Sequence, residues 1–561
     1  MGLHPTDRVA AYTAAGLWGV RSWPGLLADH VAERGDRTAV VDPPNLETIT
    51  GQVPQRLTWR ELADRVDQLA STLEHHGLRA GDTIGVQLPN STDLVATYLA
   101  IASIDAVITP FPVQYRSFEL SQMSGLAHVR AFVGTSRIHD RRLDDIRPDL
   151  EAVPGLETVL AVDDLPAHLP TRAARPDPDT IDPNDAVTIC WTSGTESVPK
   201  GVPRCPNDWH PMAISSVDAA ELTGDDVLLN PFPMVNMAGI AGMFVPWLLT
   251  GATLVQHQPF DATVFFDQIR DERVSYTVAP PALLIQSLEQ TFCTPERLQS
   301  VRVIGSGSAP LPPSMITAWR DRFDIDIINC FGSNEGISMI SDPRTVPDPA
   351  RRAVLFPRFG SEHHTWSNRA SRGIRSRLVD PSDGSEITDA EVPGELRLTG
   401  PGVFSGYLAG TASTDPFDEH GFYCTGDLFQ YVADETGDLR FLQYVDRAKD
   451  LIVRGGMNIS PAEIESLVQA HPAVAEVAVV GTPDRVLGER TRAVVALHPD
   501  QTLTLDQVVD FLREAHIASY KLPESLTVVE ALPRNPVGKV LKQELRDQAD
   551  REPQPLTGGK P

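Results

Sequence analysis

The chain has 561 residues, of which 41% are hydrophobic and 22% charged, as in a soluble globular protein. Its formal net charge of -27 argues against nucleic acid or an anionic membrane as the natural partner. A chain this long exceeds what one hydrophobic core supports, so two or more domains are expected.

The cysteines and the apolar segments indicate a cytoplasmic protein. The five cysteines are scattered with no CxxC pair, which fits a reducing cytosol and no structural zinc. Arg8, Arg21 and Pro24 interrupt the N-terminus before an apolar core forms, so no signal peptide is predicted. Residues 239–255 form the longest apolar stretch, but glycine, proline and threonine break it, so it is predicted to be core rather than a membrane span. The oligomeric state stays open, a homodimer included.

The first part of the chain alternates helix and strand signals. Thr58 and Glu61 form a capping box for a helix whose apolar face continues at Leu62 and Val66. A strand at 83–88, a helix at 91–102 and a strand at 106–109 follow, the pattern of a parallel α/β layer. Residues 166–183, rich in Pro and Asp, are typical of a surface linker, and the alternation resumes from 186 to about 340.

The rest of the chain predicts a β-rich part and then a separate small domain. Residues 350–446 contain short alternating runs and many turns. Ser460, Pro461 and Glu463 form a helix start with a reciprocal Glu. Strands at 474–480, 491–497 and 525–529 and a helix at 505–516 complete an α+β unit, and the tail after Gln548 is expected to be frayed.

The predicted fold class is therefore α/β. We expect a large N-terminal domain of stacked α/β layers plus the β-rich part at 1–446. A small mobile α+β domain follows at 447–548, with a hinge near 449, and a flexible tail occupies 549–561.

The stretch Thr192–Gly201 is a candidate phosphate loop. It follows an apolar, β-branched run at 186–191 that is typical of a buried strand. Small hydroxyl residues and glycine let backbone N–H groups close around phosphate oxygens, and Lys200 adds a positive charge. The Walker pattern GxxxxGK followed by Ser or Thr is absent, and an ordinary turn is the alternative.

Five more stretches carry residues suited to a ligand site, although each alone is equally typical of a turn or linker. Two follow predicted strands, at the end where α/β sheets bind ligands, and the others lie on glycine turns or at the domain junction. They are Ser306–Pro310 after the strand at 301–304, Cys330–Gly336 after the strand at 324–328, Tyr423–Asp427 on a glycine turn, Arg447–Gly456 and Arg534–Lys539.

The candidate phosphate loop and the five stretches follow one another in a characteristic order and spacing. Together with residues 87–90 and 115–120, they resemble the motifs of the adenylate-forming (ANL) superfamily, which contains acyl- and aryl-CoA synthetases, adenylation domains and luciferases. The resemblance covers roughly residues 20–548. Pro203-Arg204 after the loop, the ending Phe331-Gly332-x-x-Glu335-Gly336 and Arg447–Gly456 resemble the branch that activates aryl and alicyclic acids.

The resemblance implies ATP, Mg²⁺ and CoA, or a phosphopantetheine arm, as cofactors. It assigns phosphate binding to Thr192, Ser193, Gly194, Thr195 and Lys200. Glu335 would hold Mg²⁺. The nucleoside would be held by Gly307, Ser308, Ala309, Phe331, Gly332, Asn334, Asp427 and Arg447. Lys539 would reach the α-phosphate and the substrate carboxylate, stabilising the charge that spreads over the transition state. Lys449 would be the hinge, and Gly455 and Gly456 would line the thiol tunnel.

Several residues depart from the family pattern. Glu196 and Ser197 replace Thr and Gly in the phosphate loop, and a carboxylate beside triphosphate is unfavourable unless it points away or shares the metal. Asn334 replaces the usual Thr, Asn236 stands where many relatives carry a histidine, and Asp446 replaces a glycine.

The acid itself is predicted to be apolar. No Asp or Glu occurs between 227 and 260, the region that lines the acyl pocket in relatives, so an amino acid is disfavoured because its ammonium would lack a partner. The predicted pocket residues are Asn236, Met237, Ala238, Gly239 and Gly305.

The predicted activity is an ATP-dependent ligase that joins an aromatic, alicyclic or medium-chain acid to CoA, releasing pyrophosphate. A ligase that loads a carrier protein and a catalytically silent nucleotide-binding relative are the alternatives.

Overall fold

A computed structural model describes residues 2–165, 177–192, 199–361, 364–412, 414–447, 450–454, 457–484, 486–515, 517–535 and 539–551. The chain forms two compact units. The larger unit comprises Met1–Ser376 and Leu398–Tyr423, and the smaller unit comprises Arg377–Arg397 and Cys424–Pro561. The predicted domain boundary at 446/447 stays a prediction.

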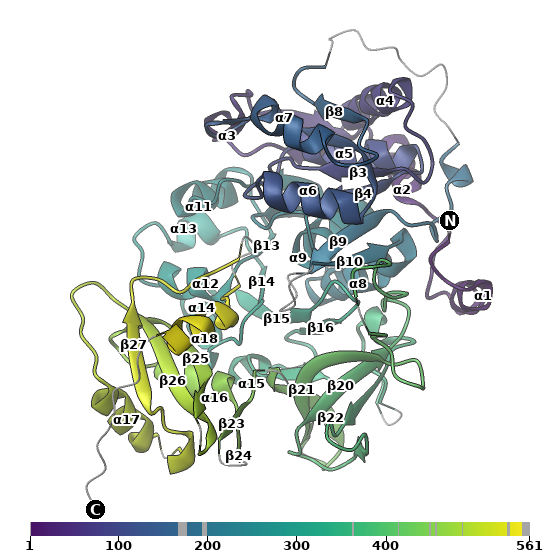
Figure 1. Ribbon diagram of the computed structural model, residues 1–561. Helices are drawn as coiled ribbons and strands as arrows, with labels where there is room; N and C mark the ends of the chain where they lie inside the picture. The colour runs from purple at the N-terminus through teal and green to yellow at the C-terminus, as the bar shows by residue number, and fades with distance from the viewer. Residues whose placement is uncertain are drawn as a thin grey trace, which may run out of the picture. The chain divides into compact units, whose positions relative to one another are not determined.

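Two twisted sheets with helices packed on them build the larger unit (Figure 1). The eight-stranded sheet has the order β16-β15-β14-β13-β11-β12-β1-β2, and only its two edge pairs, β15 with β16 and β1 with β2, are antiparallel. Its strands are β1 (Thr38–Val41), β2 (Arg56–Thr58), β11 (Val227–Asn230), β12 (Thr253–Gln256), β13 (Tyr276–Val278), β14 (Val303–Gly307), β15 (Asp326–Gly332) and β16 (Ser338–Ser341).

The six-stranded sheet has the order β10-β9-β4-β3-β5-β8. Its strands are β3 (Thr83–Val86), β4 (Val107–Pro110), β5 (Val129–Gly134), β8 (Thr158–Ala161), β9 (Thr188–Thr192) and β10 (Lys200–Arg204). The remaining strands of this unit are β6 (Arg137–Ile138), β7 (Arg141–Arg142) and β17 (Leu355–Pro357).

Most helices of the larger unit bury apolar residues. The helices are α1 (Thr6–Ala14), α2 (Trp23–Arg34), α3 (Glu47–Thr50), α4 (Trp59–His75), α5 (Thr92–Ser103), α6 (Ser117–Leu126), α7 (Leu143–Glu151), α8 (Pro206–Ala219), α9 (Met237–Gly239), α10 (Val245–Thr250), α11 (Ala262–Asp271), α12 (Pro281–Ser287), α13 (Pro295–Leu298), α14 (Pro313–Phe323), α15 (Pro349–Arg352), and the single turns η1 (Pro178–Thr180), η2 (Ile240–Phe244) and η3 (Arg369–Ser371). Helix α1 and the single turn η1 have no buried residue.

The helix and strand predictions for this part of the chain are confirmed, whereas most of the predicted linker at 166–183 lies outside the described residues. Helix α4 begins with the expected capping box, because Thr58 and Glu61 exchange hydrogen bonds with each other's backbone. The apolar stretch 239–255 is buried core, divided between η2, α10 and β12. Across the described ranges, none of the helices combines the length and apolar character needed to cross a membrane.

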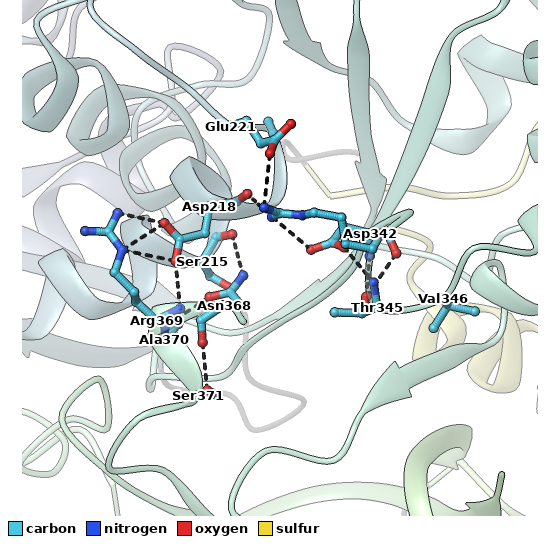
Figure 2. Close-up of polar contacts among 12 residues, drawn as sticks. Ser215, Asp218, Glu221, Asp342, Thr345, Val346, Asn368, Arg369, Ala370 and Ser371 are labelled. Atoms are coloured by element: carbon cyan, nitrogen blue, oxygen red, sulfur yellow. Dashed lines mark hydrogen bonds and ion pairs between the residues drawn. The ribbon is translucent and has the colours of Figure 1, made fainter. Parts of the chain in front are cut away.

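The end of α8 is held by a polar network that we call the α8 terminus network: Ser215, Asp218, Glu221, Arg344, Asn368 and Arg369 (Figure 2). The Asn368 amide donates to the Ser215 carbonyl over 3.1 Å, and the Arg344 guanidinium donates to the Asp218 carbonyl. Carbonyls of the last four helical residues have no i+4 partner within the helix, and the Arg344 bond to Asp218 supplies one. Two arginines also complement the negative end of the helix dipole.

The smaller unit contains the strands β18 (Arg375–Val379), β19 (Glu386–Ile387), β20 (Gly394–Thr399), β21 (Tyr423–Ala433) and β22 (Leu439–Arg447), followed by a second sheet. In that sheet β24 (Met457–Ile459), β23 (Ile452–Arg454), β26 (Gly488–Leu497) and β25 (Val474–Asp484) follow one another, and β27 (Ser525–Val529) pairs with β26. Its helices are α16 (Pro461–Val468), α17 (Leu505–Glu514), η4 (Ser519–Lys521) and α18 (Lys542–Arg551).

Alternation along β25 gives this second sheet two apolar faces. Val479 lies in one cluster with residues of α16 and α17, whereas Ala478 and Val480 pack with Leu545 of α18. One prediction here is wrong, because Glu463 does not form a capping box and its carboxylate instead pairs with Lys521 at 2.7 Å. Helix α18 ends at Arg551, and the rest of the predicted tail lies outside the described residues. Ser460 still caps α16 by accepting from the Glu463 N–H.

Candidate functional site

The predicted nucleoside residues of the larger unit lie at the ends of two neighbouring strands. Strands β14 and β15 are parallel, and Gly307 is paired with Cys330. A Cβ added at Gly307 would lie 2.1 Å from the Cys330 carbonyl oxygen, so only glycine fits this register. Ser308 follows with φ 68°, and the Phe331 ring contacts Phe356 edge-on at 5.8 Å between centroids. The structure therefore places Gly307–Ala309 and Phe331 at the carboxyl ends of two neighbouring parallel strands.

A tight turn after β15 holds Asn334 and Glu335. Ser333 N–H donates to the Ile337 carbonyl over 3.1 Å, and β15 returns as β16. Gly336 has φ 121°, and a Cβ there would lie 2.2 Å from the Gly402 carbonyl oxygen. Asn334 and Glu335 are only 8% and 7% exposed, so the turn buries two polar side chains beside the strand end.

Tyr407 contacts both charged residues that the resemblance places at the phosphates. Its hydroxyl donates to Glu335 Oε1 over 3.0 Å, and the Lys200 ammonium lies 5.4 Å from the centre of its ring. The Phe404 N–H also donates to the Glu335 carbonyl over 2.9 Å. Sequence reasoning missed Tyr407, because it lies outside every motif and nothing in the surrounding Gly402–Gly410 run distinguishes it.

The candidate phosphate loop is flanked by an antiparallel strand pair. Thr192 is the last residue of β9 and Lys200 the first of β10, and the two are paired. The predicted residues Ser193, Gly194 and Thr195, together with the atypical Glu196 and Ser197, lie outside the described residues. The structure confirms the strand ahead of the loop.

A buried arginine, Arg204, bonds to the segment that packs against the turn carrying Glu335. Arg204, at the end of β10, has 0% exposure and donates to the Gly402 carbonyl over 2.7 Å. Burial lowers the pKa of this guanidinium below its usual value, and the Asp208 charge opposes the shift. The carbonyl that Arg204 holds belongs to the residue packed against Gly336, so the arginine supports the turn that carries Glu335.

Four of the predicted acid-binding residues lie in α9 or cap it, and the fifth, Gly305, lies in β14. Asn236 caps this short helix by accepting from the Ala238 N–H over 3.0 Å. The Met237 methyl lies 2.1 Å from where a Cβ at Gly332 would be, so its thioether covers the Gly332 backbone. A Cβ at Gly305 would lie 3.0 Å from both the Tyr276 hydroxyl and the Val278 side chain. These neighbours are uncharged, and burial raises the Tyr276 pKa well above its usual value.

In the smaller unit, the predicted ribose residues pair with each other. Asp427 and Arg447 face each other across β21 and β22, with Arg447 Nε 3.3 Å from Asp427 Oδ1. The prediction that Asp427 lies on a glycine turn is wrong, because Tyr423–Ala433 form one strand. Gly426 does adopt φ 71°, a local kink inside that strand.

The remaining predicted residues also belong to the smaller unit. Lys539 is exposed, and its N–H donates to Asn535 Oδ1 over 2.8 Å. Lys449, Gly455 and Gly456 lie outside the described residues. Asp446, which departs from the family pattern, has a structural role, since its carboxylate accepts from the Ser460 hydroxyl at 2.7 Å and the Ala462 N–H at 3.0 Å at the start of α16.

Comparison with known proteins identifies the class. Residues 27–408 match the AMP-binding enzyme family, and residues 463–539 match the AMP-binding enzyme C-terminal domain. The chain belongs to the AMP-binding enzyme family.

Individual relatives match over nearly the whole chain. A 3-[(3aS,4S,7aS)-7a-methyl-1,5-dioxo-octahydro-1H-inden-4-yl]propanoyl:CoA ligase of Rhodococcus jostii is 30% identical, covering 94% of this chain and 98% of the relative. An indoleacetate–CoA ligase of Aromatoleum aromaticum is 31% identical, covering 89% of this chain and 94% of the relative. ATP-bound MatB from Rhodopseudomonas palustris is 25% identical, with a TM-score of 0.78 over 94% of this chain and 99% of that one. The predicted α/β fold and the predicted CoA-ligase class are confirmed.

Proposed function

We propose that this ATP-dependent carboxylic acid–CoA ligase activates an acid with an apolar, uncharged body, of aromatic, alicyclic or medium-chain type. In the first half-reaction the acid carboxylate attacks the α-phosphorus of ATP and pyrophosphate leaves. In the second, the CoA thiol displaces AMP from the acyl-adenylate.

The observation that carries the proposal is the absence of acidic residues from the segments that contain the predicted pocket residues and their neighbours. No Asp or Glu occurs at 227–260, 276–280 or 303–309. The groups around Gly305 are a tyrosine hydroxyl, a valine and the Cys330 thiol, and burial raises the pKa of that thiol to about 12. An ammonium group would find no counter-charge there, which makes an amino acid a poor substrate. Relatives named for an alicyclic-ring acid, for indoleacetate and for a medium-chain fatty acid support the same choice.

The residues around Glu335 suit ATP and magnesium. Mg²⁺ prefers oxygen ligands and is commonly held by one or two carboxylates together with substrate phosphates. Glu335 supplies such a carboxylate, fixed by Tyr407 and close to the strand end that carries Lys200. When bound, Mg²⁺ would offset the triphosphate charge. Thr192 and Lys200 would hold the phosphates, and Gly307–Ala309 with Phe331 would bracket the adenine.

The smaller unit would supply the ribose ligands Asp427 and Arg447 and the lysine of the first half-reaction, Lys539. Lys449 would act as the hinge, and Gly455 and Gly456 would line the thiol path. None of the five cysteines, all within the described residues, is part of a disulfide, which is compatible with a reducing compartment and supports a cytoplasmic location.

ATP–pyrophosphate exchange across a panel of aryl, alicyclic, medium-chain and amino acids tests the substrate class. We expect exchange with at least one apolar acid and none with amino acids. No exchange with any acid, for a protein that melts cooperatively and binds ATP, would indicate a catalytically silent relative. An adenylate that a carrier protein discharges and free CoA does not would assign the acceptor to the carrier.

Separating the half-reactions tests Lys539. Lys539→Ala should abolish adenylation and spare thioester formation from supplied acyl-adenylate, because only the first step develops charge on the α-phosphate. Lys521→Ala, which removes an ammonium paired with Glu463 in the same unit, is the control and should leave both half-reactions intact. Equal loss of both steps in Lys539→Ala would contradict the assigned role.

A further inference from the structure

We propose that Asn334 is a positioning residue that couples the acid side of the site to the strand leading into the phosphate loop. The inference rests on the proposed function. Asn334 Oδ1 accepts from the Met237 N–H over 2.7 Å, and its Nδ2 donates to the Trp191 carbonyl over 3.3 Å. One side chain thus bonds to two segments that are 97 and 143 residues away in sequence.

Each of these bonds reaches a residue adjacent to a predicted ligand contact. Met237 is the first residue of α9, directly after Asn236. Trp191 precedes Thr192, the last described residue before the phosphate loop, and is paired with Gly201 of β10. Asn334 is itself next to Glu335. The amide therefore joins the acid-binding helix, the phosphate-binding strand pair and the metal-binding carboxylate.

The chemistry of the amide explains why asparagine stands here. An amide offers an acceptor and a donor on separate atoms, so it can serve an N–H and a carbonyl at once. A carboxylate could accept from Met237 but would face the Trp191 carbonyl with no proton to give. A threonine has one oxygen for both tasks. Because Asn334 is 92% buried (8% exposed), a lost partner would not be replaced readily by water.

The turn around Asn334 leaves the amide little freedom to adjust. Gly336 N–H donates to the Ser333 carbonyl over 3.2 Å, and Gly336 packs against Gly402. The Met237 thioether rests on Gly332, two residues before Asn334. A displacement of the start of α9 would therefore move the Trp191 carbonyl through a stiff connection. Acid binding and triphosphate binding would then reinforce each other, and by linkage the effect is reciprocal.

A buried asparagine elsewhere in the larger unit provides a matched control. Asn368, 1% exposed, donates to the Ser215 carbonyl over 3.1 Å and accepts from the Ala370 N–H over 3.0 Å. It makes the same two kinds of bond, but its partners are the Ser215 carbonyl of the α8 terminus network and the Ala370 N–H, and neither is a predicted site residue (Figure 2). A purely structural asparagine should behave like Asn368.

The experiment compares Asn334→Asp, Asn334→Thr and Asn368→Ala with the wild type. KM for ATP is measured by pyrophosphate exchange at low and at saturating concentrations of an active acid from the panel, and Tm is measured for each protein. Asn334→Asp keeps the Met237 bond and loses the Trp191 bond. We expect it to raise KM for ATP about tenfold and to abolish the dependence of that KM on acid, and Asn334→Thr to show the same direction. Asn368→Ala should lower Tm and leave both KM values within about twofold.

A turnover-free measurement separates this inference from the proposed function. Calorimetric titration with ATP alone should show about tenfold weaker binding to Asn334→Asp or, if that variant does not fold, to Asn334→Thr. If no acid supports exchange, the ligase assignment fails, and weakened ATP binding in both Asn334 variants still supports the positioning role of Asn334 on the ATP side. Unchanged KM and unchanged ATP affinity, with a Tm loss like that of Asn368→Ala, would overturn it. A wild type that binds no ATP would overturn both.

Discussion

Two buried asparagines in the larger unit perform the same chemistry with different consequences. Asn334 and Asn368 each accept one backbone N–H and donate to one distant carbonyl. Around Asn368 the neighbours are arginines and carboxylates that finish α8, so its bonds stabilise a helix end. Around Asn334 the neighbours are the predicted ligands of ATP and acid. The location of the partners, rather than the bonds themselves, separates a functional polar network from a structural one.

The largest expected effect is that of Glu335→Gln, which changes the predicted metal ligand next to Asn334. Glu335→Gln keeps the size of the side chain and an acceptor for Tyr407, but removes the charge that would hold Mg²⁺ at the triphosphate. We expect kcat/KM to fall about a thousandfold, or ~4 kcal/mol, with little change in Tm. Glu221→Gln removes a carboxylate from the α8 terminus network and should leave the activity intact. A comparable loss of kcat/KM in both variants would show that the contacts around Glu335 and the α8 terminus network do not differ in function.

An effect of intermediate size is expected on the pH dependence of stability, and it involves His210 in α8. His210 lies inside α8, and burial lowers its pKa from 6.5 to about 4. The folded state therefore favours the neutral ring. Its contribution to stability is present above pH 6.5 and is lost as the pH falls towards 4. His210→Gln should reduce the drop in unfolding free energy between about pH 7 and about pH 4.5 by roughly 2 kcal/mol in urea titrations.

His75→Gln, on the exposed face of α4, is the matched control for the pH measurement. Its acid sensitivity should equal that of the wild type. If His210→Gln loses as much stability on acidification as the wild type, the burial of an uncharged ring in α8 is not the cause.

A smaller loss of stability is expected from the α8 terminus network itself. Asp218 accepts from Arg369 Nη2 at 2.6 Å and from the Arg369 N–H at 2.7 Å. Asp218→Asn weakens both bonds and should cost about 1–2 kcal/mol of unfolding free energy without changing KM for ATP. Asp225→Asn, which breaks an exposed pair with Arg37, should cost less than about 0.5 kcal/mol. An altered KM in Asp218→Asn would connect this network to the site.

The smallest effect is expected at Tyr407. Tyr407→Phe removes the hydroxyl that donates to Glu335 and keeps the ring beside Lys200. Because Glu335 keeps its charge, we expect kcat/KM to fall only about threefold to tenfold. Tyr407→Leu, which also removes the ring, should lower it further. An unchanged kcat/KM in both variants would show that Tyr407 only packs against the site.

Local patterns predicted most of the fold. The capping box of α4, the strand at 525–529 and the strand ends that carry the ligand residues follow from signals within a few residues. The exception at Asp427 is instructive. Glycine predicts a turn, and Gly426 does adopt a positive φ, but pairing with β22 from Asp427 onwards keeps the following residues in one strand.

The polar contacts of the site were less accessible to sequence reasoning. Asn334 was recognised as a departure from the family pattern, and its two partners are fixed only when distant segments pack together. Tyr407 and the buried Arg204 likewise take their importance from neighbours such as Glu335 and Gly402. A single sequence marks the ligand-binding motifs, whereas the residues that hold those motifs in place need coordinates.

The contact between Met237 and Gly332 has a consequence for redesign of the substrate range. A side chain added at Gly332 or Gly239, two of the predicted ligand-binding residues, would collide with Met237 or with the Pro233 carbonyl. The thioether is the one adjustable part of that contact, because methionine is unbranched and repacks easily. A library meant to admit bulkier acids should therefore vary position 237 and leave the glycines untouched.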